Sequence, residues 1–141
     1  MSANDEAPGK IPNRVSESEV KAVREVIHQF CDGISNLDAA AIGKAFHADG
    51  SSFSVTPRGL CIEPAANWPE IIEKAKNDSG HLFRQKHSKR ILRIDIVDSV
   101  AAAKVEWLFK TTRVLDFYNL AKINGRWYIL NQVYHVFDRS K

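Results

Sequence analysis

Four residues near the C-terminus could together move a proton: Asp116, Tyr118, Asn131 and His135. A carboxyl group beside aromatic side chains such as Trp107 is partly desolvated, which brings its pKa towards neutral pH. Histidine exchanges protons in that range, and Tyr118 and Asn131 could donate hydrogen bonds to a developing oxyanion. We therefore expect Asp116 and His135 to be the catalytic pair. The alternative is a buried hydrogen-bond network that fixes the curvature of a sheet.

These residues lie in the two arms of a predicted β-hairpin. Segments rich in β-branched and aromatic residues flank Asn124-Gly125, a pair that readily takes the positive φ angles of a two-residue type I′ turn. Because side chains alternate between the faces of a strand, a tight turn fixes the register of both arms. The predicted pairs are Ile123 with Arg126, Lys122 with Trp127, Leu120 with Ile129, Tyr118 with Asn131, Asp116 with Val133 and Val114 with His135.

Three helices are expected before the hairpin. Ser16 and Glu19 have the spacing of a capping box, and apolar residues recur at three- and four-residue steps behind them. Asp38 can cap a second helix over residues 39–46. A third helix is predicted over residues 68–76, because a proline fits its first turn and Asn, Asp, Ser and Gly follow it.

The other strands are expected on either side of the turn Pro57-Arg58-Gly59 and over residues 90–97 and 101–109. Both faces of the sheet carry apolar side chains, so both need a cover. The helices can cover only one, and we expect the other to form a homodimer interface. The helix-covered face should include Leu92, Ile94, Val105 and Trp107, and the opposite face Leu115, Phe117, Tyr128, Leu130 and Tyr134.

Composition indicates one globular domain. The chain has 141 residues, 44% hydrophobic and 26% charged, with a formal charge of +3. We expect a flexible tail over residues 1–15, a single domain over 16–138 and a cytoplasmic location. The two cysteines, Cys31 and Cys61, lack metal-ligand spacing, and each sits in an apolar context that suits a buried free thiol, so neither a disulfide nor a metal site is predicted.

Helices followed by a long antiparallel meander resemble the nuclear transport factor 2-like superfamily, in particular its SnoaL-like and lumazine-binding branch. The segments that carry the resemblance are Asn36-Leu-Asp38, Ala45-Phe-His-Ala-Asp49, Ala103-Lys-Val105, Asp116-Phe-Tyr118 and Leu120-Ala-Lys-Ile-Asn-Gly-Arg-Trp127. The resemblance implies an α+β fold, a cone-shaped barrel of curved sheet packed on three helices, with a pocket between them and commonly a dimer. In the ketosteroid isomerase relatives a tyrosine and a carboxylate base stand where this chain has Phe30 and Ser54, which argues against the steroid isomerase mechanism.

The expected pocket is apolar with a few polar groups. His28 could reach it or remain a hydrogen-bonded histidine at the core edge, and His47 could line it or could cap a helix end and shape the turn that follows. Trp68, Trp107 and Phe83 are the side chains that could plug it. The predicted ligand contacts are Tyr118, Asn131, Trp107, His28, Phe30, His47, Leu120 and Trp127.

A basic run, Arg84 to Arg90 with Arg93, could bind phosphate or an acidic partner. It could equally protect an exposed strand edge from pairing. No aromatic residues interleave it to stack on bases, and nucleic-acid binding is not expected.

Two functions fit the sequence. The first is binding of a small hydrophobic molecule with polar substituents, with any chemistry being cofactor-independent proton transfer of the isomerase, dehydratase or cyclase type. The alternative is a non-catalytic interaction or dimerisation module of the same fold.

Overall fold

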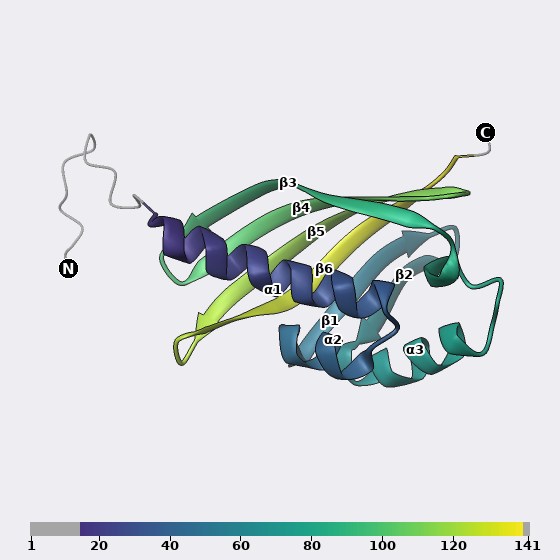
Figure 1. Ribbon diagram of the computed structural model, residues 1–141, viewed down its shortest axis with the longest axis horizontal. Coiled ribbons are helices and arrows are strands. Elements are labelled where there is room, and N and C mark those ends of the chain that lie inside the picture. The colour runs from purple at the N-terminus through teal and green to yellow at the C-terminus, as the bar shows by residue number, and fades with distance from the viewer. Residues whose placement is uncertain (1–14, 140–141) are drawn as a thin grey trace.

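The structure is a computed structural model that describes residues 15–139. Three α-helices lie on one side of a curved six-stranded sheet, and α1 crosses the concave face (Figure 1). The predicted tail, apart from Val15, lies outside the described residues. Between residues 15 and 139, every helix is too short or too polar to cross a bilayer.

The helices begin where the sequence predicts. α1 (Glu17–Ser35) starts after Ser16, whose hydroxyl accepts a hydrogen bond from the Glu19 amide at 3.2 Å. α2 (Ala39–Ala45) starts after Asp38, whose carboxylate accepts from the Ala41 amide at 3.1 Å. These caps satisfy amide groups that a helix leaves free. α3 spans Trp68–Lys76, with short 3-10 helices η1 (Ala65–Asn67) before it and η2 (Leu82–Arg84) after it.

The sheet is open, and its strand order is β2-β1-β6-β5-β4-β3. β1 and β6 run parallel, while the other neighbouring pairs are antiparallel. β3 stands last in this order and is an edge strand. Its Lys89, Arg90 and Arg93 form ion pairs with Asp32, Glu106 and Asp95, respectively. This placement fits the edge-protecting role of the basic run. The strands are β1 (Phe46–Thr56), β2 (Gly59–Pro64), β3 (His87–Val97), β4 (Val100–Phe109), β5 (Thr112–Ile123) and β6 (Arg126–Asp138).

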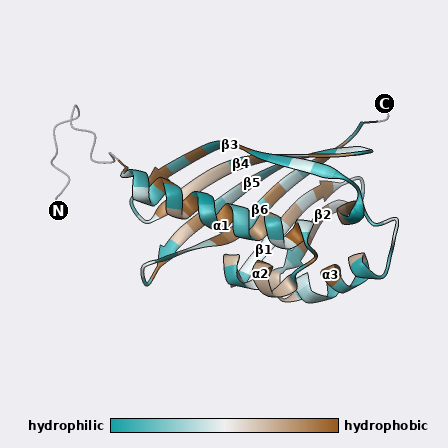
Figure 2. Ribbon diagram, viewed as in Figure 1, coloured by the Kyte–Doolittle hydropathy of each residue, from teal (hydrophilic) through white to brown (hydrophobic). Residues whose placement is uncertain are grey.

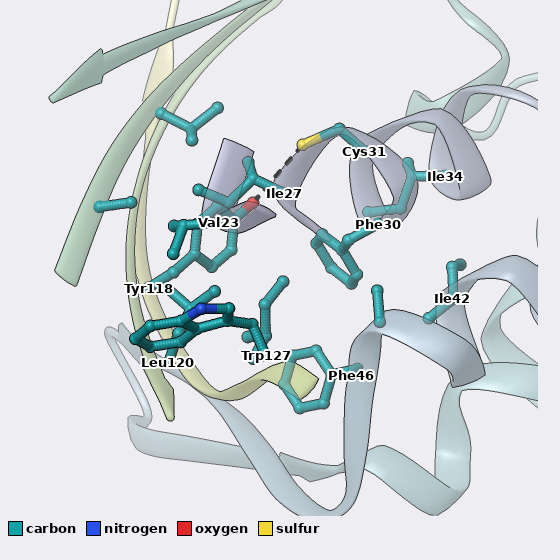
Figure 3. Close-up of a cluster of buried hydrophobic side chains, with 14 of the residues drawn as sticks. Val23, Ile27, Phe30, Cys31, Ile34, Ile42, Phe46, Tyr118, Leu120 and Trp127 are labelled. Carbon is teal, nitrogen blue, oxygen red and sulfur yellow. Dashed lines mark hydrogen bonds between the residues drawn. The ribbon is translucent and has the colours of Figure 1, made fainter. Parts of the chain in front are cut away.

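The core lies between α1, α2 and the concave face of the sheet. Hydrophobic and hydrophilic residues alternate along the strands (Figure 2), as expected when one face is buried. Phe30 of α1 is fully buried, and its ring meets those of Phe46 and Tyr118 at centroid distances of 5.6 Å (Figure 3). The predicted apolar stripe of α1 is buried at Val23, Ile27, Phe30 and Ile34.

The hairpin turn has the predicted form, but the register changes along its arms. Asn124 and Gly125 have φ angles of 52° and 80°, and the pairs from Ile123–Arg126 to Leu120–Ile129 are as predicted. Leu130 is then an extra residue in β6, a β-bulge, because Asn119 pairs with Asn131.

Beyond this bulge the predicted register is wrong by one residue. Tyr118 pairs with Gln132, Asp116 with Tyr134, and Val114 with Val136. Because a one-residue shift exchanges the two faces of a strand, Asn131 and His135 point to the convex face. Gln132 and Tyr134 take the concave positions, which corrects the predicted outward placement of Tyr134.

A second bulge affects β3. Ile91 pairs with Val105 and Arg93 with Lys104, so Leu92 is the unpaired residue and is 39% exposed. The prediction that Leu92 faces the core is therefore wrong, and Ile91 packs against the core in its place.

Candidate functional site

The Asp116 carboxyl group is the polar centre of the concave face. The residue is 1% exposed, and two neutral donors bond its Oδ2 atom. The Tyr118 hydroxyl donates at 2.6 Å, and the Trp107 indole N–H donates at 3.0 Å. Tyr118 follows two residues later on β5 and therefore faces the same side, while Trp107 reaches across from β4. The structure thus brings Asp116, Tyr118 and Trp107 together.

Burial raises the pKa of Asp116 to about 6, while hydrogen bonding by Tyr118, Gln132 and Trp107 opposes the rise. Gln132 is held on β6, where its amide oxygen accepts from the Ser52 hydroxyl at 2.8 Å. The other carboxyl oxygen, Oδ1, is buried and has no hydrogen-bond partner within the usual distance and angle limits. A carboxyl group in this state can exchange a proton near neutral pH.

Tyr118 and Cys31 lie behind this carboxyl group, inside the core. Burial, and next the charge of Asp116, raise the pKa of Tyr118 well above its ordinary value, so its hydroxyl remains a neutral donor. The Cys31 sulfur lies 4.0 Å from the Tyr118 hydroxyl (Figure 3), and burial raises its pKa to about 12. Neither group changes charge at the pH values where Asp116 does.

A pocket of about 340 Å³ lies between the concave face and the segment from α3 to η2. Ser52, Trp107, Asp116 and Gln132 are buried residues of its wall that carry hydrogen-bonding groups, and the wall also contains Val136, which is half exposed. The three aromatic residues that could have plugged it instead line it. The other lining residues are Ile34, Glu63, Trp68, Ile71, His81, Leu82, Phe83, Phe109, Val114 and Tyr134.

Four of the predicted ligand contacts lie in the core and are absent from the pocket wall. They are at most 3% exposed and pack in the main hydrophobic cluster (Figure 3): Phe30, Tyr118, Leu120 and Trp127. Phe30 meets the Trp68 ring edge-on at 5.4 Å, so it supports one wall of the pocket from behind. These side chains therefore shape the cavity without lining it.

Asn131 and His135 are on the wrong face for the predicted site. The Asn131 side-chain oxygen accepts a hydrogen bond from Asn119 at 2.9 Å on the convex face. His135 is exposed, and its ring packs against Phe137 at 4.6 Å. The catalytic pair predicted from the sequence does not exist as a pair, because the bulge in β6 separates its members.

The other two predicted histidines also lie outside the pocket. His28 is exposed on α1. His47 is half-buried, accepts a hydrogen bond from the Asp49 amide at 3.0 Å and packs edge-on against Tyr128. The turn-shaping alternative for His47 is therefore the one that its contacts support.

Sequence reasoning missed several polar residues of the pocket. Gln132 was missed because the bulge was not recognised, and Ser52 because its pairing with Gln132 depends on the parallel contact of β1 with β6. Glu63 accepts from the Asn67 side-chain amide at 2.5 Å, and His81 accepts from the Phe83 amide at 3.1 Å. Glu63 and His81 lie where no periodic pattern indicates a facing direction.

The sequence model of the family described as "Putative lumazine-binding" matches residues 18–135. The chain belongs to this family. The match covers most of the described domain and places the chain in the nuclear transport factor 2-like superfamily, in its lumazine-binding and SnoaL-like branch. No curated protein matches the chain.

Solved structures agree with this membership of the lumazine-binding family. A nuclear transport factor 2-like protein of unknown function from Shewanella baltica OS155 is 25% identical, with a TM-score of 0.76 over 89% of this chain and 98% of that chain. A similar protein of unknown function from Methylobacillus flagellatus KT is 25% identical, with a TM-score of 0.71 over 91% and 99%.

A ketosteroid isomerase-like protein from Erwinia carotovora atroseptica SCRI1043 has a TM-score of 0.67 at 10% identity, over 86% of this chain and 98% of that chain. At that identity the likeness concerns the fold alone. Phe30, which is expected at the place of the isomerase tyrosine, is fully buried in the core. Ser54, which is expected at the place of the carboxylate base, is half-buried and is not among the residues that line the pocket, whereas Ser52 of the same strand is.

Proposed function

We propose that the protein binds a small, mainly apolar molecule with one or two polar substituents in the pocket beneath α3 and η2. The observation that carries this proposal is the buried Asp116 carboxyl group in a largely apolar wall, with Oδ1 lacking a partner. The Trp68 indole N–H, also in the wall, is a second buried group without a partner. Buried polar groups normally have partners, so a ligand that meets both would stabilise the folded protein.

The proposed chemistry is proton transfer by Asp116 without a cofactor. With a pKa of about 6, roughly nine carboxyl groups in ten are ionised at pH 7, so Asp116 would act first as a base. Tyr118 and Trp107 hold its Oδ2 and orient the carboxyl group. An isomerase or lyase reaction can proceed with a single group that takes up a proton and then gives it back, and Asp116 suits that role.

A thermal-shift screen of small aromatic and alicyclic molecules tests the binding proposal. We expect compounds with an apolar body and one or two polar groups to raise the melting temperature in proportion to the logarithm of their concentration. Asp116→Asn should weaken the hits, and Glu106→Gln, a carboxyl-to-amide change on the convex face, should not. A screen without hits, or hits equally strong with Asp116→Asn, would refute the proposal.

We also propose that two copies associate through the convex face in the cytoplasm. Large apolar side chains are exposed there, including Phe117 at 54% and Val133 at 44%, which pair with each other across β5 and β6. Cys61 is exposed, although the sequence predicts a buried thiol there, and an exposed free thiol supports a reducing compartment. Sedimentation equilibrium should give twice the chain mass at micromolar concentration, and Phe117→Glu should give the monomer. A monomeric unmodified chain would contradict this proposal.

A further inference from the structure

The ionisable groups of the pocket wall have a sign opposite to that of the whole protein. The chain carries a formal charge of +3. Glu63 and Asp116 are the acidic residues of the wall, and His81 is its only imidazole. Of the described residues that line the pocket, none is a lysine or an arginine. An anionic ligand would therefore enter the pocket against two carboxyl groups and without a fixed cation to pair with.

The rest of the wall is rich in aromatic rings, whose faces attract cations. The Trp107 and Phe109 rings are stacked side by side, 5.7 Å apart and nearly parallel at 9°. The aromatic residues of the wall are Trp68, Phe83, Trp107, Phe109 and Tyr134. Such a wall holds an organic cation better than a metal ion, because rings supply surface contact while a metal requires several oxygen or nitrogen ligands.

The Asp116 carboxyl group lacks the positive partner that a buried carboxylate normally has. Trp107 and Tyr118 donate to its Oδ2, and Gln132 is a further hydrogen-bonding neighbour, but all three groups are neutral. Its Oδ1 is buried without a partner. A charge in this position is costly unless a cation is brought to it, and the pocket is the space from which one can come.

We propose that the pocket takes an organic cation, a protonated or quaternary amine attached to an apolar body, with the ammonium group beside Asp116 and the aromatic rings around the body. The proposal rests on the proposed function, since it names the chemical class of the ligand for the same pocket. Glu63 contributes a second negative charge to the wall. A neutral ligand that only donates hydrogen bonds to Asp116 is the competing outcome.

Cation binding should depend on pH. Burial raises the pKa of Asp116 to about 6, so a cation that needs the ionised carboxylate should bind more tightly as pH rises through that value. The ionisable groups around the carboxyl group are Tyr118 on β5, Cys31 on α1, Glu63 on β2, Tyr134 on β6 and His81 before η2. His81→Gln removes the imidazole and Glu63→Gln removes the second carboxyl group, so the double variant leaves the contribution of Asp116 to be measured.

Three probes with one body separate the possibilities: 2-phenylethylammonium, 2-phenylethanol and phenylacetate, titrated against the full chain by NMR at about pH 8, where the amine remains protonated. We expect the ammonium to bind about tenfold or more tightly than the alcohol, and phenylacetate not to bind. Asp116→Asn should weaken the binding of the ammonium by a larger factor than that of the alcohol, and should thereby remove this preference. Glu63→Gln, which spares Asp116, should reduce the preference by a smaller factor, and Glu106→Gln should leave it unchanged.

An alcohol that binds as tightly as the ammonium would overturn the cation proposal and leave the proposed function in place. If no probe binds, the cation proposal also fails, and the thermal-shift screen decides separately whether the pocket binds anything. Equal preference for the ammonium in the unmodified chain, in Asp116→Asn and in Glu63→Gln would likewise overturn it.

Discussion

Two carboxyl groups on neighbouring strands have opposite surroundings. Asp116 of β5 lies opposite Val105, so Glu106 is one residue further along β4 and the pleat sends it to the convex face. Arg90 and Arg113 donate to the two oxygens of Glu106 at 3.0 and 2.8 Å. The Arg113 hydrogen bond, together with Arg90, lowers the pKa of Glu106, whereas burial raises that of Asp116.

The two carboxyl groups differ in whether the fold gives them a positively charged partner: among the residues that the structure describes, Glu106 has two, and Asp116 has none. On the convex face two guanidinium groups keep Glu106 ionised, so this carboxylate is part of the structure. On the concave face neutral donors orient Asp116 without fixing its charge. A group that is held in place yet free to change protonation is what a binding or catalytic site needs.

The largest contrast between the faces should appear in the free energy of unfolding when a phenylalanine is truncated. Phe30 is fully buried against three aromatic rings, and Phe117 on the convex face is 54% exposed. Phe30→Ala should cost about 3–5 kcal/mol.

Phe117→Ala is the matched control and should cost only about 0.5 kcal/mol in dilute solution. Its cost should rise with protein concentration if the convex face forms a dimer, while that of Phe30→Ala should not. Urea unfolding at two protein concentrations measures both. Equal losses in dilute solution would mean that the faces do not differ in burial as described.

The second contrast is the pH dependence of stability. The pKa of Asp116 rises from 3.8 to about 6 on folding, so the folded state holds its proton more tightly and stability falls as pH rises between these values. The cost at neutral pH is about 3 kcal/mol, from about two pKa units.

Asp116→Asn removes this titration. The variant should therefore gain stability relative to the unmodified chain between about pH 4 and pH 7, by up to about 3 kcal/mol. Urea unfolding across this range measures the difference, and Glu106→Gln is the control for a carboxyl-to-amide change. A difference that stays constant with pH would show that the carboxyl group of Asp116 is not desolvated.

The sequence predicts those features of the concave site that depend on residues close together in the chain, such as a turn, a helix cap or the alternation along one strand. Asn124-Gly125 sets the register of the nearest pairs because a two-residue turn leaves no freedom there, and Ser16 and Asp38 mark helix starts by their own side chains. Asp116 and Tyr118 share a face because they are two residues apart on one strand, which no bulge in the partner strand can change.

What could not be predicted depends on contacts between distant segments. Leu130 is the extra residue of the β6 bulge, yet nothing in its own type distinguishes it from a regular strand residue, and this single insertion removed Asn131 and His135 from the predicted site. Glu63 and His81 enter the pocket because β2 and the segment after α3 pack beside it. Alternation along one strand contains no information about that packing.

The smallest expected effect is the pH dependence of stability that Glu106 causes, and its sign is opposite to that of Asp116. Its pKa is lowered on folding by the hydrogen bond from Arg113, and then by Arg90. Its contribution to stability is therefore present above the ordinary pKa of 4.5 and is lost as pH falls through the lower folded value. Glu106→Gln should be less stable than the unmodified chain at neutral pH, and the two should converge on acidification, the reverse of the trend for Asp116→Asn.

High salt should reduce the effect of Glu106→Gln, because the side chain of Arg90 is 72% exposed and the Debye length at 1 M ionic strength is about 3 Å. Salt should leave the pH trend of Asp116→Asn nearly unchanged, since burial rather than an exposed ion pair causes it. Urea unfolding from about pH 3 to pH 7 at low and high salt measures both variants. If acidification widened the gap between Glu106→Gln and the unmodified chain, the two guanidinium groups would not be what holds Glu106 ionised, and the contrast between the faces would rest on burial alone.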